Sequence, residues 1–78
     1  MRQKTPTLVI TLATTTQAMA MEKFCQTQGL PGRLIPVPRE ITAGCGLSWK
    51  ADPADKDALE AALTQNDMKW QDMHIIEI

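Results

Sequence analysis

The chain has 78 residues, of which 44% are hydrophobic and 22% are charged, and its formal net charge at pH 7 is −1. This length supports one hydrophobic core, so we expect a single domain over residues 1–78, with residues 1–6 as a lead-in. The charges are mixed along the chain and form no basic stripe, which argues against nucleic-acid binding. No apolar run approaches the roughly 20 residues that a membrane-spanning helix needs.

The start of the chain has some features of a secretory signal, because a basic segment and a short apolar run precede Ala18-Met19-Ala20. However, threonines dilute the apolar run, and cleavage after this site would remove a predicted strand and the start of a helix. The two cysteines, Cys25 and Cys45, are also too few for a secreted disulfide scaffold. We therefore expect a cytoplasmic protein with reduced thiols.

The first predicted elements are a buried strand and an amphipathic helix. Residues 7–13, TLVITLA, are apolar and β-branched on both faces, as in a central strand. Thr14 and Gln17 have the spacing of a capping box, so a helix should begin near Thr15 and stop at Gly29. Its buried stripe consists of Ala18, Met21 and Cys25, with Phe24 beside it.

The middle of the chain predicts two further strands. Residues 32–38, GRLIPVP, form the first of them. Pro36 and Pro38 have no N–H group to donate, so this strand must lie at a sheet edge. Residues 47–51 form the other strand, whose buried face consists of Leu47, Trp49 and Ala51.

The last third of the chain predicts a second helix and a fourth strand. Asp52 is a typical N-cap residue, and Pro53 suits the first helical position. The helix should end near residues 66–67, and residues 70–78 form the final strand. The buried face of this helix consists of Ala58, Leu59, Ala62 and Leu63.

The element order is βαββαβ, which predicts the α+β ferredoxin-like fold, a four-stranded antiparallel sheet with both helices on one face. In this fold the second strand is an edge strand, as its prolines require. Strand directions alternate, so the exit of the first strand, the 39–46 loop and the exit of the second helix share one end of the sheet. Cys45 is thus expected near the N-terminus of the first helix.

Cys45 is the main candidate site residue, because Gly44 and Gly46 flank it and allow positive φ and close approach of a partner. The first-turn N–H groups at Thr15 and Thr16 favour a thiolate by about 0.3–1 kcal/mol, and Arg39 on the same loop adds to this effect. The alternative is structural: the glycines only turn the chain, and Cys45 fills a small space. The residue pattern by itself leaves both interpretations open.

Other candidate sites are weaker. Cys25 lies on the apolar stripe of the first helix, so we interpret it as a core residue. It also lies about 15 Å along the helix from Thr15, so we expect no disulfide with Cys45. His74 is the only histidine and is interpreted as a sheet-face residue. One histidine and two separated cysteines have no metal-site spacing, and we expect neither a metal nor a cofactor.

Three stretches, TTTQAMAMEKFC, GLPGRLIPVPREI and AGCGLSW, resemble in their order and spacing a family of small bacterial selenium/sulfur carrier-like proteins. The resemblance covers about residues 7–51, and the remainder agrees only in general character. It implies a ferredoxin-like domain that holds sulfur or selenium as a persulfide or selenosulfide on Cys45. It also implies donor and acceptor proteins as partners, for example a cysteine desulfurase. Arg39 and Glu40 belong to the motif PRE and have no assigned role.

Three functional hypotheses follow. The first is a sulfur or selenium carrier, which needs no second catalytic group and is therefore a carrier protein more than an enzyme. The second is a non-catalytic interaction or dimerisation module, because a small domain gains stability as a homodimer and edge strands pair with partner sheets. The third is a redox sensor that forms an intermolecular Cys45–Cys45 disulfide.

Overall fold

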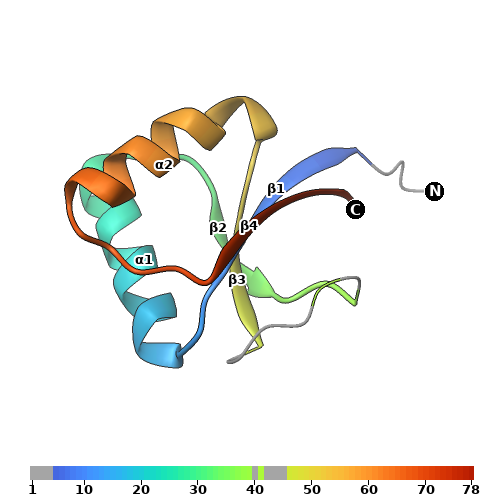
Figure 1. Cartoon of the computed structure of the whole chain (residues 1–78), viewed down its shortest axis with the longest axis horizontal. Helices are drawn as coiled ribbons and strands as arrows, with labels where there is room; N and C mark the ends of the chain where they lie inside the picture. The colour runs from blue at the N-terminus through green and yellow to red at the C-terminus, as the bar shows by residue number, and fades with distance from the viewer. Residues whose placement is uncertain (1–4, 40, 42–45) are drawn as a thin grey trace.

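The computed structural model describes residues 5–39, 41 and 46–78. The strands and helices follow in the order β1 (Pro6–Thr11), α1 (Thr15–Gln28), β2 (Arg33–Pro36), β3 (Leu47–Ala51), a 3-10 turn η1 (Pro53–Asp55), α2 (Lys56–Gln65) and β4 (Asp72–Glu77). The strands form one antiparallel sheet in the order β2-β3-β1-β4, and both helices lie on the same side of it (Figure 1). The predicted ferredoxin-like fold is confirmed, and β2 lies at an edge as its prolines required.

The strand register brings the ends of several elements together. Thr11 at the end of β1 lies opposite Ser48 on one side and Asp72 on the other. The Thr11 hydroxyl is fully buried, and it accepts a hydrogen bond from the Asp72 N–H at 3.0 Å. Pro36 at the end of β2 lies opposite Leu47. The exits of β1 and β2 and the entries of β3 and β4 therefore meet at one end of the sheet.

The core lies between the sheet and the helices. Its buried members are Leu8, Ile10, Trp49 and Ala51 on the sheet, Leu12 directly after β1, and Ala18, Met21, Cys25, Leu59 and Leu63 on the helices. Trp49 is only 2% exposed, and its indole N–H donates a hydrogen bond to the Pro31 carbonyl at 3.1 Å. Burying each large apolar side chain contributes about 1.5–3 kcal/mol, which makes this layer the main source of stability.

The opposite face of the sheet is also largely covered, although no described helix lies on it. Val9 is fully buried there, between Lys50 of β3 and His74 of β4 in the register. In Figure 1 the chain that follows β2 runs on the side of the sheet away from the helices. Val37 and Ile41 of this connection are half-buried. Val37 and Ile41 therefore help to cover the second face.

One predicted core residue is wrong, and several boundaries shift. Ala58 is exposed, because Leu59 and Leu63 lie one turn apart and by themselves fill the buried stripe of α2. Ala62 is half-buried. The Asp52 carboxylate caps the turn η1 rather than α2, accepting a hydrogen bond from the Ala54 N–H at 2.9 Å. β1 begins at Pro6, β2 ends at Pro36 and β4 spans only Asp72–Glu77.

Neither described helix is long and apolar enough to cross a membrane.

Candidate functional site

The site predicted around Cys45 lies on the connection between β2 and β3. Cys45, Gly44 and Glu40 lie outside the described residues, so the site is built from the residues that flank them. The Val37 N–H donates a hydrogen bond to the Gly46 carbonyl at 3.0 Å, which extends the β2–β3 pairing beyond the sheet. Gly46 is exposed and has a φ of 76°, in the left-handed region that favours glycine. The chain thus enters β3 from a backbone conformation at Gly46 that favours glycine.

Arg39 lies on the first part of the same connection. The Ile41 N–H donates a hydrogen bond to the Pro38 carbonyl at 3.0 Å, which closes a turn that contains Arg39. Arg39 is exposed, and in the described part of the chain no carboxylate lies within ion-pair distance of it. Its guanidinium is therefore available to an anion on the loop or on a partner.

The N-terminus of α1 forms the opposite side of the predicted site. The Thr14 hydroxyl accepts a hydrogen bond from the Gln17 N–H at 3.1 Å, as a capping box requires. The Gln17 side chain bonds to the Ala13 N–H at 3.1 Å instead of returning to Thr14. Thr15 and Thr16 are exposed, and the first turn contains no acidic residue. The positive end of α1 is thus not neutralised by its own side chains.

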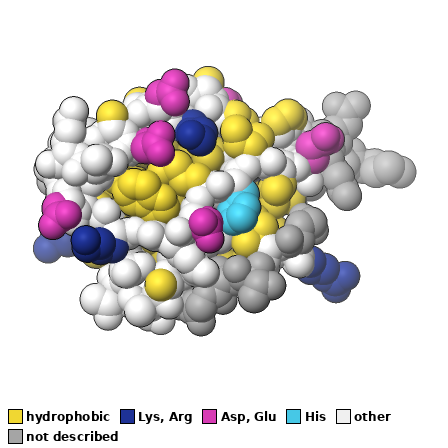
Figure 2. All heavy atoms as spheres, in the orientation of Figure 1, with side chains coloured by type: hydrophobic (Ala, Val, Ile, Leu, Met, Phe, Trp, Pro, Cys, Tyr) yellow, Lys and Arg dark blue, Asp and Glu magenta, His cyan; other side chains and the backbone are white. Residues whose placement is uncertain are grey.

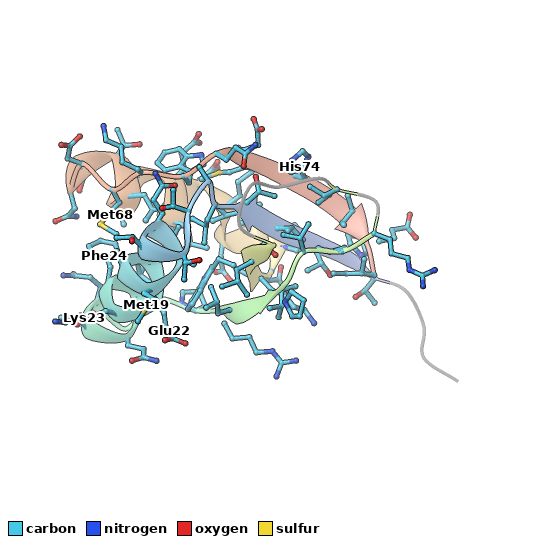
Figure 3. All side chains as sticks on the ribbon, turned by 90° about the horizontal axis from the view of Figure 1, so that it is seen from below. Met19, Glu22, Lys23, Phe24, Met68 and His74 are labelled. Carbon is cyan, nitrogen blue, oxygen red and sulfur yellow. The ribbon has the colours of Figure 1, made fainter. Side chains whose placement is uncertain are left out.

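The fold brings these segments to the same end of the sheet. Gly46 precedes Ser48 by two residues, and Ser48 lies opposite Thr11, only four residues before α1 begins. The segment after α2 also lies here, because Asp67, Met68 and Lys69 line a hollow of about 190 Å³ together with residues at the start of α1. Figure 3 shows Met68 beside α1. The described flank of Cys45, the start of α1 and the exit of α2 are therefore neighbours.

Cys25 is the cysteine whose environment the structure describes. It is fully buried in the core, and its Sγ lies 3.8 Å from the Sδ of Met21. Burial raises the pKa of its thiol from 9.0 to about 11. A buried thiol with a raised pKa is a poor nucleophile, so the interpretation of Cys25 as a core residue is supported.

The raised pKa of Cys25 predicts a loss of stability in alkaline solution. Below pH 9 the thiol is protonated in both states, but between the ordinary pKa of 9.0 and the folded value of about 11 only the unfolded chain loses its proton. The free energy of unfolding should therefore fall by about 2–3 kcal/mol across this window. Urea denaturation of the wild type and of Cys25→Ala at several pH values measures this loss of stability. The comparison isolates the Cys25 thiol, because the lysines titrate in both proteins. Parallel pH profiles would contradict it.

His74 lies opposite Val9 on the sheet face that carries no described helix, as expected for a sheet-face residue. It is half-buried, and Figure 2 shows its imidazole at the molecular surface. Within the described ranges, no group of three His, Cys, Asp or Glu side chains is arranged to hold a metal ion. The sequence interpretation missed a different pair, Arg33 and Lys50, which only the strand register brings together.

Comparison with known proteins gives one match. A family model described as "Putative Se/S carrier protein-like" matches residues 7–75. No curated protein and no solved structure matches the chain at a significant level. The match extends through α2 and most of β4, beyond the segment whose motifs carry the resemblance. The chain therefore belongs to the Se/S carrier protein-like family.

Proposed function

We propose that this protein carries sulfur or selenium on Cys45 between a donor and an acceptor protein in the cytoplasm. The Cys45 thiolate attacks the outer sulfur of a donor persulfide, and a new S–S bond forms as the donor S–S bond breaks. The donor thiolate leaves with the electron pair, and the proton remains with the carried sulfur. An acceptor nucleophile then attacks the same sulfur, and Cys45 leaves as a thiolate. The transfer needs no external oxidant, and a cysteine desulfurase is a suitable donor.

The burial of Cys25 is the observation that carries this proposal. The chain contains two cysteines, and a sulfur carrier of this kind needs a thiol that a partner can reach. Cys25 is 0% exposed, and burial raises the pKa of its thiol to about 11. The family membership implies a carrier cysteine, so this role falls to Cys45.

The flanking residues support the reactivity of Cys45. A helix N-terminus typically stabilises a nearby anion by about 0.3–1 kcal/mol, which lowers a thiol pKa by less than one unit. The exposed start of α1 and Arg39, which has no ion-pair partner among the described residues, would together stabilise a thiolate more than either one alone. Gly46 leaves open space where a Cβ would lie, which favours the approach of a partner sulfur.

Mass spectrometry after incubation with cysteine and a cysteine desulfurase tests the carrier function. We expect the intact protein to gain one sulfur atom, and peptide masses to place it on Cys45. Cys45→Ala should lose this loading completely, whereas Cys25→Ala should keep it, because the second substitution removes only a core thiol. Loading that persists in Cys45→Ala, or wild-type protein that never gains sulfur, would refute the proposal.

A second candidate function, a protein-interaction module, has its own supporting observation. β4 lies at the edge of the sheet, so the backbone groups on its outer side face no described strand. It contains no proline, so its backbone N–H groups could pair with a partner strand. Ile75 on this strand is 53% exposed, and Figure 2 shows further hydrophobic side chains at the surface near the segment that leads into β4. A partner strand would complete this edge.

Analytical ultracentrifugation of the wild type and of Ile75→Lys tests the interaction module, and Cys45 loading of the same variant tests whether the carrier function is independent of it. If β4 forms a dimer, the wild type should sediment as a dimer and the variant as a monomer with unchanged Cys45 loading. A wild-type monomer at all concentrations would exclude the homodimer.

A further inference from the structure

Two basic side chains lie next to each other on the sheet face that carries no described helix. Arg33 of β2 is directly opposite Lys50 of β3 in the register. Their neighbours Leu34 and Trp49 pack into the core on the helix side, so alternation along each strand places Arg33 and Lys50 on the other side. Like charges directly opposite each other destabilise a sheet. The pairing of Arg33 with Lys50 is therefore not a source of sheet stability.

The two side chains meet at a pair of adjoining hollows. A groove of about 430 Å³ is lined by Thr5, Arg33, Ile35, Pro36, Pro38, Lys50 and Ile78. A second hollow, of about 490 Å³, shares Thr5, Arg33 and Lys50 with it and extends toward η1. These volumes are within the range of small-molecule sites. The groove thus has two cations at its junction with the second hollow and apolar walls along β2.

Among the described residues, no carboxylate forms an ion pair with these cations. Asp52 and Asp55 line the second hollow, but neither lies within ion-pair distance of Arg33 or Lys50 in the described chain. The Asp52 carboxylate instead accepts the Ala54 N–H at 2.9 Å. No Asp or Glu lines the 430 Å³ groove, and its one carboxylate is the terminal group of Ile78, which forms no ion pair with Arg33 or Lys50 in the described chain. Among the described residues, the groove therefore presents two cations and one carboxylate beside an apolar wall, an excess of one positive charge.

We propose that this groove binds a small organic carboxylate with an apolar tail, independently of the chemistry at Cys45. The planar guanidinium of Arg33 matches the two oxygens of a carboxylate, and Lys50 adds a second charge from the adjacent strand. The tail then lies along Ile35, Pro36 and Pro38. Two cations with one apolar wall suit a monoanion of this shape better than a highly charged inorganic ion.

NMR titration of the protein with hexanoate, acetate and inorganic phosphate at constant ionic strength tests the site. We expect hexanoate to produce saturable shifts of the Arg33, Ile35 and Lys50 amides, and acetate to bind at least tenfold more weakly. Phosphate that binds as tightly as hexanoate, or shifts that never saturate, would overturn the proposal.

Charge variants supply the matched comparison. Arg33→Gln and Lys50→Gln should each weaken hexanoate binding at least tenfold, whereas Lys69→Gln, which removes the same charge outside the groove, should leave it unchanged. Both groove variants should unfold at an equal or higher temperature than the wild type, because each removes a like-charge pair. Equal weakening in all three variants would show general charge attraction and overturn the site.

Discussion

Iodoacetamide should modify Cys45 more than a thousandfold faster than Cys25 in the native protein at pH 7.5. A thiol with a pKa of about 8.5 is roughly 9% ionised at this pH, but one with a pKa of about 11, as burial gives Cys25, is only about 0.03% ionised. The greater nucleophilicity of the more basic thiolate reduces this ratio to about twentyfold. Burial accounts for the rest of the thousandfold difference in rate, because the reagent reaches Cys25 only when the core opens.

Intact mass and peptide mapping over time measure this difference. The wild type should gain one adduct quickly and a second only over a much longer period. Cys45→Ala should remain unmodified while the wild type reacts, and Cys25→Ala should react like the wild type. In urea both cysteines should react, which shows that the difference depends on the fold. Equal, slow modification of the two cysteines would favour the interaction module over the carrier.

Gly32→Ala should lower the free energy of unfolding by about 3 kcal/mol or more. Gly32 has a φ of 114°, where an alanine is strained by about 1–3 kcal/mol. A Cβ at this position would also overlap the Lys50 carbonyl and the Trp49 indole, and overpacking of this kind typically costs about 1–3 kcal/mol. A chain of 78 residues has a total stability of only about 4–12 kcal/mol, so this loss is large.

Gly29→Ala is the matched control for this prediction. Gly29 ends α1 in the left-handed conformation with a φ of 68°, but nothing lies within 4 Å of the position that a Cβ would take. Alanine there should cost only about 1–2 kcal/mol, from backbone strain alone. Urea denaturation followed by far-UV circular dichroism compares the two variants. Similar losses in both would mean that the close approach of Gly32 to β3 has no energetic effect.

Local sequence signals predicted most of the fold. Thr14 and Gly29 bound α1 as their capping chemistry indicated, and β3 occupies the predicted residues Leu47–Ala51. Pro36 ends an edge strand, because a missing N–H group cannot be tolerated in the middle of a sheet. Ala58 was wrongly predicted to be buried, because helical periodicity alone does not show where a buried stripe ends. In the structure a 3-10 turn precedes α2, and Ala58 near the start of this helix is exposed.

The element order, the edge position of β2 and the assignment of Cys25 to the core could all be predicted from local patterns, because capping, proline chemistry and periodicity act over a few residues. Cys45 was chosen as the candidate carrier from a family resemblance in its motif. Which distant side chains are neighbours became visible only in the folded chain. The opposition of Arg33 and Lys50, and the overlap that a Cβ on Gly32 would have with β3, depend on strand register. Register results from the packing of the whole sheet, in which a slip of one residue reverses every side chain.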